Sequence, residues 1–98
     1  MMRVRHADRK LERLETDLNY TAGYDRALVK AFRKRMQLIR SARDEREFFA
    51  LKSLHYEKLK GSRQYQRSMR LNDQFRLIVT LEEMNGKTVI IVSIEDYH

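Results

Sequence analysis

The amino-acid sequence predicts an α+β fold in which a short N-terminal strand and two to three helices pack on a mainly antiparallel C-terminal sheet. Up to about residue 55, apolar residues recur every three or four positions, as in helices, and after it every second position, as in strands. The 98 residues include no proline and only three glycines, which favours regular elements joined by few loops. A chain of this length has room for one core, so we expect a single domain over residues 1–98.

The N-terminal half is expected to contain a weak strand over residues 2–6, followed by helices. Asp8 is a candidate N-cap of the first helix, and Gly23 is a candidate stop or turn. The apolar face of this helix would consist of Leu11, Leu14 and Leu18. Asp25 can cap the second helix, which has the clearest periodicity in the chain. Its apolar face would consist of Leu28, Val29, Phe32, Met36, Ile39 and Ala42.

A third, shorter helix is predicted after a capping-box pattern. Asp44 stands at the cap position and Glu47 follows three residues later, so the two side chains can accept reciprocal hydrogen bonds from the backbone. Apolar residues then follow at Phe48, Phe49, Leu51 and Leu54.

The first predicted hairpin has a three-residue loop over residues 72–74. This length keeps both apolar sets on one face, with Met69 opposite Leu77, and it sets Arg70 directly opposite Arg76. The apolar faces of the two strands would consist of Tyr65, Met69 and Leu71, and of Phe75, Leu77, Val79 and Leu81.

The second predicted hairpin turns at Asn85-Gly86, a strong signal for a two-residue turn. The register of such a turn pairs Leu81 with Ile90, Val79 with Val92, Leu77 with Ile94 and Arg76 with Glu95. The last strand, 89–94, is apolar on both parities, so we expect it in the interior of the sheet.

Cationic residues are concentrated in one part of the chain. Lysines and arginines number 21 against 14 acidic residues, a formal net charge of +7, so we expect an anionic partner. Residues 58–76 contain six cations and one acid, Asp73. A solvated basic face is one interpretation. Anion binding is the other, because two opposed arginines repel each other and an anion between them would remove that cost.

The N-terminal residues become charged at once and have no secretory pattern. The longest apolar run, 89–92, is far shorter than the roughly 18–20 residues that cross a bilayer. The chain has no cysteine, which fits a reducing compartment. We therefore expect a cytoplasmic protein with no membrane partner.

The segment Glu95-Asp96-Tyr97-His98 gathers groups that transfer or orient protons. A frayed, functionless tail is the alternative. The histidines have no ligand spacing with carboxylates, so no metal site is expected. No serine or threonine has the sequence context of a catalytic nucleophile. Cations facing acid–base groups suggest a metal-free ribonuclease, in which the 2′-hydroxyl of RNA attacks the adjacent phosphate.

The same residues resemble the HigB toxins, or plasmid maintenance killer proteins, of the RelE/ParE superfamily. The resemblance is carried by about forty C-terminal residues, in the segments Leu59-Lys60-Gly61-Ser62-Arg63, Asn72-Asp73-Gln74-Phe75-Arg76 and Glu95-Asp96-Tyr97-His98. It implies a compact RelE/ParE-like fold and the toxin of a bacterial type II toxin–antitoxin system. Such a toxin is a ribosome-dependent mRNA endoribonuclease that needs no cofactor and acts in the A site of the 70S ribosome, inhibiting translation.

The resemblance also implies partners and site residues. A HigA-like antitoxin with a helix-turn-helix domain would inhibit the toxin, and operator DNA would be contacted only through that antitoxin. Lys60 and Arg76 would stabilise the phosphate, and the terminal acid, phenol and imidazole would be Asp96, Tyr97 and His98. Residues expected to bind RNA are Lys58, Arg63, Arg67, Arg70 and Gln74.

Two departures from the family pattern leave the general base open. Some members have a histidine three residues before the lysine, where this chain has Glu57, and some have an asparagine where it has Gln74. Candidates for the base are Glu57, Tyr97 and His98, of which we favour His98 for proton transfer, with Tyr97 orienting the RNA. Two other functions are alternatives: a non-enzymatic, ParE-like inhibitor of gyrase, and a basic RNA-binding module.

Overall fold

The computed structural model describes residues 1–82 and 87–96. Its elements, in chain order, are β1 (Arg3–His6), α1 (Arg9–Thr16), α2 (Arg26–Ser41), α3 (Arg46–Ala50), the 3₁₀ turn η1 (Lys52–Leu54), β2 (Glu57–Lys58), the 3₁₀ turn η2 (Gly61–Arg63), β3 (Gln66–Arg70), β4 (Phe75–Leu81) and β5 (Thr88–Asp96). The strands form one sheet in the order β1-β5-β4-β3-β2. All neighbours are antiparallel except β1 and β5, which are parallel. The predicted α+β class and mainly antiparallel sheet are confirmed.

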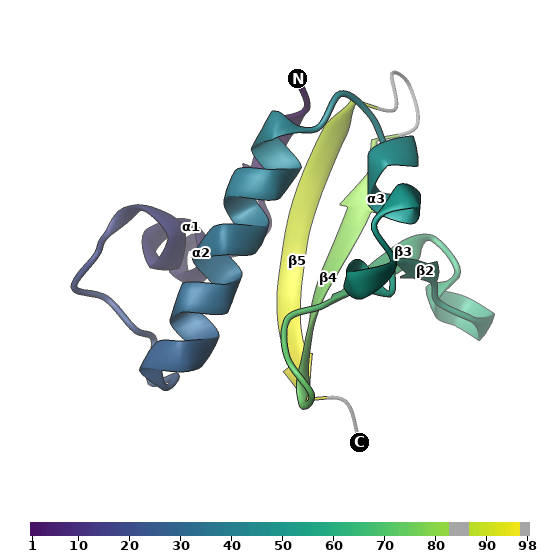
Figure 1. The fold of residues 1–98 in the computed structure, drawn as a ribbon. Coiled ribbons are helices and arrows are strands. Elements are labelled where there is room, and N and C mark those ends of the chain that lie inside the picture. Colours follow the sequence, from purple (N-terminus) through teal and green to yellow (C-terminus); the bar gives the residue numbers. More distant parts are fainter. Residues whose placement is uncertain (83–86, 97–98) are drawn as a thin grey trace.

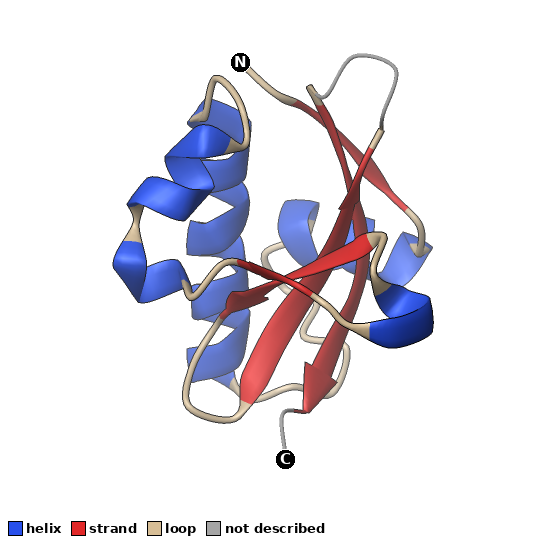
Figure 2. Cartoon of the chain, turned by 90° about the vertical axis from the view of Figure 1, so that its right-hand side faces the viewer, coloured by secondary structure: helices blue, strands red, loops and turns tan. Residues whose placement is uncertain are grey.

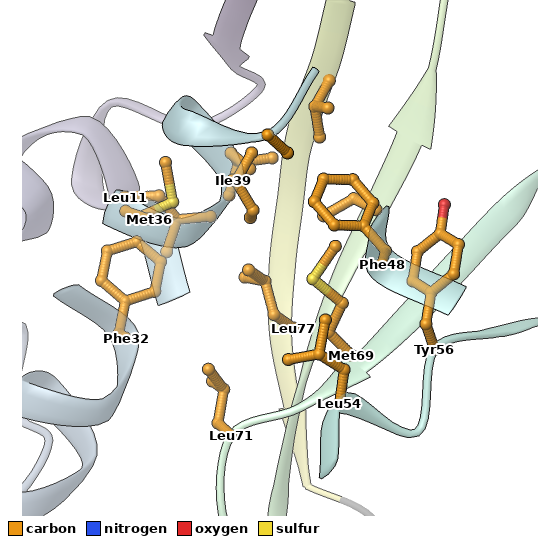
Figure 3. Close-up of a cluster of buried hydrophobic side chains, with 14 of the residues drawn as sticks. Leu11, Phe32, Met36, Ile39, Phe48, Leu54, Tyr56, Met69, Leu71 and Leu77 are labelled. Atoms are coloured by element: carbon orange, nitrogen blue, oxygen red, sulfur yellow. The ribbon is translucent and has the colours of Figure 1, made fainter. Parts of the chain in front are cut away.

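The helices cover one face of the sheet, with α2 lying along β5 (Figure 1). Figure 2 shows α2 and α3 on one side of the strands and η2 on the other. The core between helices and sheet contains Phe32, Met36 and Leu77, all fully buried (Figure 3). Side chains alternate along a strand, so Arg76 projects from the face of β4 opposite to Leu77. No helix among the described residues is long and apolar enough to cross a membrane.

The predicted caps and apolar faces of the first two helices are largely confirmed. The carboxylate of Asp8 accepts from the backbone N–H of Lys10 at 2.8 Å, and all six predicted apolar residues of α2 are buried. The prediction for Leu18 is wrong, because α1 ends at Thr16 and Leu18 is 78% exposed. The carboxylate of Asp17 accepts from the N–H of Asn19 at 3.0 Å, and this local turn competes with a further turn of helix.

The third helix is shorter than predicted. The Asp44 carboxylate accepts from the N–H of Arg46 at 2.9 Å, and the Glu47 carboxylate accepts from the N–H of Arg43 at 2.6 Å, one residue before the predicted cap. Helix α3 itself has five residues and ends at Ala50. It buries Phe48 but leaves Phe49 and Leu51 exposed, since so short a helix presents only a narrow face to the core.

The sheet confirms the first predicted hairpin and corrects the second. Arg70 pairs with Arg76 and Met69 with Leu77, as the three-residue loop requires. Tyr65, however, precedes β3 and is 60% exposed. In the second hairpin the predicted pairs Leu77–Ile94 and Arg76–Glu95 form, whereas Leu81 pairs with Val89 and Val79 with Ile91.

A β-bulge accounts for the difference in the second hairpin. The register shifts between Ile78 and Val79, and Val92 is the extra residue on β5. As a result Val89 and Ile91 face the core on one side of the bulge, and Ile94 faces it on the other. Odd-numbered positions of β5 face the core before the bulge and even-numbered positions face it after the bulge, so apolar residues occur at both. The predicted turn at Asn85-Gly86 lies outside the described residues.

The predicted N-cap of α2 can be tested by substitution of Asp25. The Asp25 carboxylate accepts from the N–H of Leu28 at 2.8 Å. Replacing Asp25 by alanine should lower the free energy of unfolding by about 1 kcal/mol, because an N–H at the helix start loses its acceptor. Asp25→Ser keeps an acceptor and should cost much less. Urea denaturation of both variants measures the difference, and equal losses would contradict a capping role.

Candidate functional site

A pocket of about 200 Å³ opens where the β3–β4 hairpin meets the chain that leads from η1 into β2. Its walls are formed by His55, Arg70, Asn72, Asp73 and Arg76. Two of the predicted site residues, Arg70 and Arg76, therefore lie together, directly opposite each other on neighbouring strands. They project from the face of the sheet that α2 does not cover, where a ligand can approach.

Arg76 is held in place on the pocket wall. The residue is only 9% exposed, and its Nη2 donates to the carbonyl oxygen of His55 at 2.9 Å. The same nitrogen lies 3.4 Å from a carboxylate oxygen of Glu57, whose side chain is more than half exposed. Burial of the aliphatic stem and fixation of the head make Arg76 a preorganised cation, which is the property that electrostatic stabilisation of a phosphate requires.

Arg70 is held by the hairpin loop. Its guanidinium donates to the Asp73 carboxylate through Nη2 and to the Asn72 carbonyl oxygen through Nε, at 3.3 Å in the second case. The side-chain oxygen of Asn72 in turn accepts from the N–H groups of Gln74 and Phe75, at 2.9 and 2.7 Å. The repulsion predicted between Arg70 and Arg76 is thus relieved within the chain by the carboxylates of Asp73 and Glu57.

The C-terminal end of β5 lies beside this hairpin. Asp96 pairs with Phe75 in the sheet, and its carboxylate accepts from the side-chain amide of Gln74 at 3.0 Å. Glu95 accepts from both terminal nitrogens of Arg63, at 3.1 and 2.6 Å, and these bonds lower the pKa of the Glu95 carboxyl below its ordinary value. The predicted catalytic residues Tyr97 and His98 lie outside the described residues, so their roles stay predictions.

Other predicted site residues do not reach the pocket. Arg63 spans from η2 to Glu95, across the face opposite to the helices. Arg67 donates to the Glu45 carboxylate at 3.1 Å, on the face that the helices cover. Lys58 and Lys60 are exposed, and neither lines the pocket. Of the predicted RNA-binding residues, Arg70 lines the pocket, Arg63 and Arg67 form ion pairs within the chain, and Lys58 and Gln74 do neither.

Two residues near the pocket were not predicted from the sequence. His55 lines it, in the left-handed backbone conformation with φ of 47°, and its carbonyl oxygen holds Arg76. Arg35 of α2 donates to the carbonyl oxygen of Arg70 at 2.8 Å, and burial lowers its pKa. Because β2 has only two residues, no pattern in the sequence could set the register that carries His55 to the side of Arg70.

Solved structures of several bacterial toxins resemble this structure over nearly its whole length. A YoeB–YefM complex from Staphylococcus aureus matches with a TM-score of 0.62 at 19% identity, over 100% of this chain and 98% of the other. The chain has the RelE/YoeB toxin fold. YafQ from Escherichia coli matches with 0.57 at 12% identity, over 98% and 93% of the two chains. The toxin–antitoxin complex RelBE2 from Mycobacterium tuberculosis matches with 0.52 at 15%, over 98% of each.

No protein-family model matches the sequence, and no curated protein matches it. At these identities the structural likeness establishes the RelE/YoeB fold, and the finer resemblance to the HigB toxins stays a prediction. The function of a chain depends on the chemistry of its site, which here is the arginine pocket. That pocket offers two fixed arginines for an anion, with the carboxylates of Glu57 and Asp73 close by as proton acceptors.

Proposed function

We propose that this chain is the toxin of a bacterial type II toxin–antitoxin system and a ribosome-dependent endoribonuclease that cleaves mRNA. The observation that carries the proposal is the pair Arg70–Arg76, two cations set opposite each other in a pocket on the face of a RelE/YoeB-like sheet that α2 does not cover. Their planar guanidinium groups match the geometry of phosphate oxygens. The C-terminal residues with proton-transfer groups follow the strand that pairs with Arg76.

The proposed reaction needs only groups of this chain and the RNA itself. The 2′-hydroxyl oxygen bonds to the adjacent phosphorus, the bond from phosphorus to the 5′-oxygen breaks, and the products are a 2′,3′-cyclic phosphate and a 5′-hydroxyl. A base takes the hydroxyl proton and an acid supplies one to the leaving oxygen. Arg76 and Arg70, with Lys60 entering from its exposed position, offset the charge that develops on the phosphoryl oxygens.

Glu57 and His98 are our candidates for the two proton transfers. The Glu57 carboxylate lies 3.4 Å from Arg76, so it is within reach of a phosphate bound to that arginine. His98 follows Asp96, which is anchored beside the hairpin by Gln74, and Tyr97 between them would orient the RNA. In this scheme His98 and Glu57 share the roles of acid and base.

We further propose that the partners are the 70S ribosome with mRNA in its A site, and a HigA-like antitoxin with a helix-turn-helix domain. Operator DNA would be bound through the antitoxin. In support, solved structures with this fold include a YoeB–YefM complex and a RelBE2 toxin–antitoxin complex. The proposed place of action is the bacterial cytoplasm, where mRNA and ribosomes are found.

Primer extension on mRNA after brief induction tests the proposal. We expect cuts in codon phase within translated reading frames, and in a purified system cuts only when ribosomes are present. Tyr97→Phe and His98→Gln should reduce the cuts if the terminal residues act as proposed. DNA breaks trapped with gyrase and no RNA cleavage would favour the ParE-like alternative. RNA binding with neither effect would favour a simple binding module.

A further inference from the structure

An ion pair crosses the face of the sheet that carries the arginine pocket. It joins Arg63, the last residue of η2, to Glu95 of β5. In the sheet, β4 lies between β5 and β3, the strand that follows η2 in the chain. Figure 2 shows η2 on the side of the strands away from α2, which is the side from which Arg70 and Arg76 project. We call this ion pair the Arg63–Glu95 clamp.

The register of the sheet places the Glu95 side chain next to the arginine pocket. Glu95 is the direct cross-strand partner of Arg76, so the two side chains project from the same face of the sheet. Opposite charges at directly opposed positions of an antiparallel pair attract each other, because their Cβ atoms lie only about 4.5–5.5 Å apart. A carboxylate at this position is therefore a competitor, built into the chain, for any phosphate that binds to Arg76.

Arg63 binds that carboxylate with two nitrogens. Its Nη1 donates to one oxygen of Glu95 at 3.1 Å, and its Nη2 donates to the other at 2.6 Å. The second oxygen also accepts from the hydroxyl of Ser93 at 3.1 Å. The bonds from Arg63 are the main cause that lowers the pKa of Glu95, so its side chain is ionised near neutrality. Arg63 thus holds a full negative charge one strand away from Arg76.

The guanidinium group of Arg63 is committed to partners within the chain. Its Nε donates to the side-chain oxygen of Gln66 at 2.8 Å, so all three of its nitrogens donate to groups of the protein. The side chains of Arg63 and Glu95 are 44% and 40% exposed, and exposed ion pairs contribute little to the stability of a fold. Stability therefore accounts for little of this arrangement, and Arg63 has few donors left for RNA.

We propose that Arg63 is a positioning residue of the arginine pocket, which binds the Glu95 carboxylate and so keeps it from competing with the RNA phosphate for Arg76. Arg63 would raise the affinity of the pocket for a phosphodiester without contacting that phosphodiester. This role differs from the RNA contact that the sequence predicts for Arg63. The inference rests on the proposed function only in taking the arginine pocket as the phosphate site.

Binding of a 2′-deoxy dinucleotide tests the proposal, because a probe without a 2′-hydroxyl binds and is not cleaved. The probe is titrated into the full-length, isotope-labelled chain, and the backbone N–H signals of Arg70 and Arg76 give the dissociation constant. Arg63→Met should raise this constant about fivefold, which corresponds to a cross-strand ion pair of about 1 kcal/mol. Arg9→Met removes an exposed cation of α1 as the control, and it should change the constant less than about twofold.

A second substitution separates positioning from direct contact. Glu95→Gln keeps the shape of the side chain and removes its charge, so by itself it should change the dissociation constant less than about twofold. In the Arg63→Met background it should restore the constant to within about twofold of the wild-type value, because the competing carboxylate is gone. Glu12→Gln removes an exposed carboxylate of α1 and should restore nothing in that background. A Glu95→Gln double variant that binds as weakly as Arg63→Met would overturn the proposal and make Arg63 a direct RNA contact.

Cleavage of mRNA on ribosomes, measured on the same variants, distinguishes this inference from the proposed function. If the wild-type chain cleaves no RNA but the dinucleotide affinities follow the expected order, the nuclease function fails and the role of Arg63 stands. If the wild-type chain cleaves mRNA and Arg63→Met binds the dinucleotide as tightly as the wild type, the role of Arg63 fails and the nuclease function stands. Thermal unfolding of each variant confirms that it is folded.

Discussion

Replacing Arg76 by lysine should lower the rate constant of RNA cleavage by about 100- to 1,000-fold while the fold stays intact. Loss of one preorganised donor to a developing oxyanion has an effect of this size, and lysine cannot reproduce the planar fork of arginine. In this structure the guanidinium group of Arg76 contacts two groups of the chain at once. One nitrogen is held by the carbonyl oxygen of His55, 2.9 Å away, and faces Glu57 at 3.4 Å. A lysine side chain has a single nitrogen, so it cannot contact both of these groups and a phosphate at the same time.

The measurement is single-turnover cleavage of mRNA on purified ribosomes, with the dissociation constant of the toxin–ribosome complex determined separately. The rate constant should fall much more than the affinity, because Arg76 lies inside a small pocket and most cations of the chain lie elsewhere. Arg46→Lys, on α3 with a side chain 90% exposed, is the matched control and should leave both quantities unchanged. If affinity fell in proportion to rate, Arg76 would be a general phosphate contact and its proposed catalytic role would be wrong.

Arg70→Lys should have a weaker effect than Arg76→Lys. The Arg70 side chain is 40% exposed against 11% for Arg76, and it is bound to Asp73 on an exposed loop. A solvated cation contributes less to the stabilisation of a phosphate than a buried one, since water screens it. The difference between the two substitutions therefore measures how much of the effect depends on burial.

The pair Arg70–Arg76 shows how far the sequence could predict the site. A three-residue loop and the requirement that apolar residues share a face leave one register for β3 and β4, and that register sets the two arginines opposite each other. Local rules therefore sufficed for this part. The partners of these arginines could not be predicted in the same way, because Glu57 and His55 arrive from a two-residue strand that has no periodicity.

The second hairpin shows a different limit. A register can be extrapolated from a turn only while the strands stay regular, and the bulge at Val92 shifts it by one residue. The described pairs before the bulge, such as Leu81–Val89, differ from the prediction by one residue, and the bulge reverses that shift, so the pairs beyond it, such as Arg76–Glu95, agree with the prediction. A bulge inserts one extra residue within a strand, so a register that is extrapolated from the turn does not include it.

Charge alone did not identify which arginines line the pocket. Arg63 and Arg67 belong to the cationic segment 58–76 but contact Glu95 and Glu45. These acids lie 32 and 22 residues away along the chain, so the ion pairs follow from the tertiary fold. The Tyr56 hydroxyl also donates to Glu45, at 2.5 Å, and burial together with that carboxylate raises the pKa of Tyr56. Arg67, Tyr56 and Glu45 thus form one hydrogen-bonded network in which the Glu45 carboxylate accepts from both of the others.

The last prediction concerns a polar network on the other side of the molecule, where β1, α1 and α2 meet. The Glu15 carboxylate accepts from Arg40 Nε and Nη2 at 2.6 and 2.9 Å, and it lies 2.9 Å from Nε2 of His6. The side chains of Glu15 and His6 are 13% and 7% exposed. Glu15→Gln removes the charge with little change of shape, and it should lower the free energy of unfolding at pH 7 by about 2 kcal/mol, the usual contribution of hydrogen bonds to a charged group.

The pH dependence of this loss gives the sharper test. The hydrogen bond from Arg40 is the main cause that lowers the pKa of Glu15 below its ordinary value of 4.5. A carboxyl whose pKa is lower in the folded state stabilises the fold fully above its unfolded pKa, and this stabilisation is lost as the pH falls through the folded pKa. The difference between the wild-type chain and Glu15→Gln should therefore be constant near neutrality and shrink below about pH 4.5.

Urea denaturation at a series of pH values measures both quantities, with Glu12→Gln on the exposed side of α1 as the control. The control should change the stability by less than about 0.5 kcal/mol at any pH, because an exposed carboxylate rehydrates freely. A difference for Glu15→Gln that stays constant from neutral pH down to pH 3 would mean that its cost comes from altered packing and not from the charge. A difference that shrinks with acid would show that the network links the three elements through the ionised carboxylate, and that it holds α1 against α2 on the side of the molecule away from the arginine pocket.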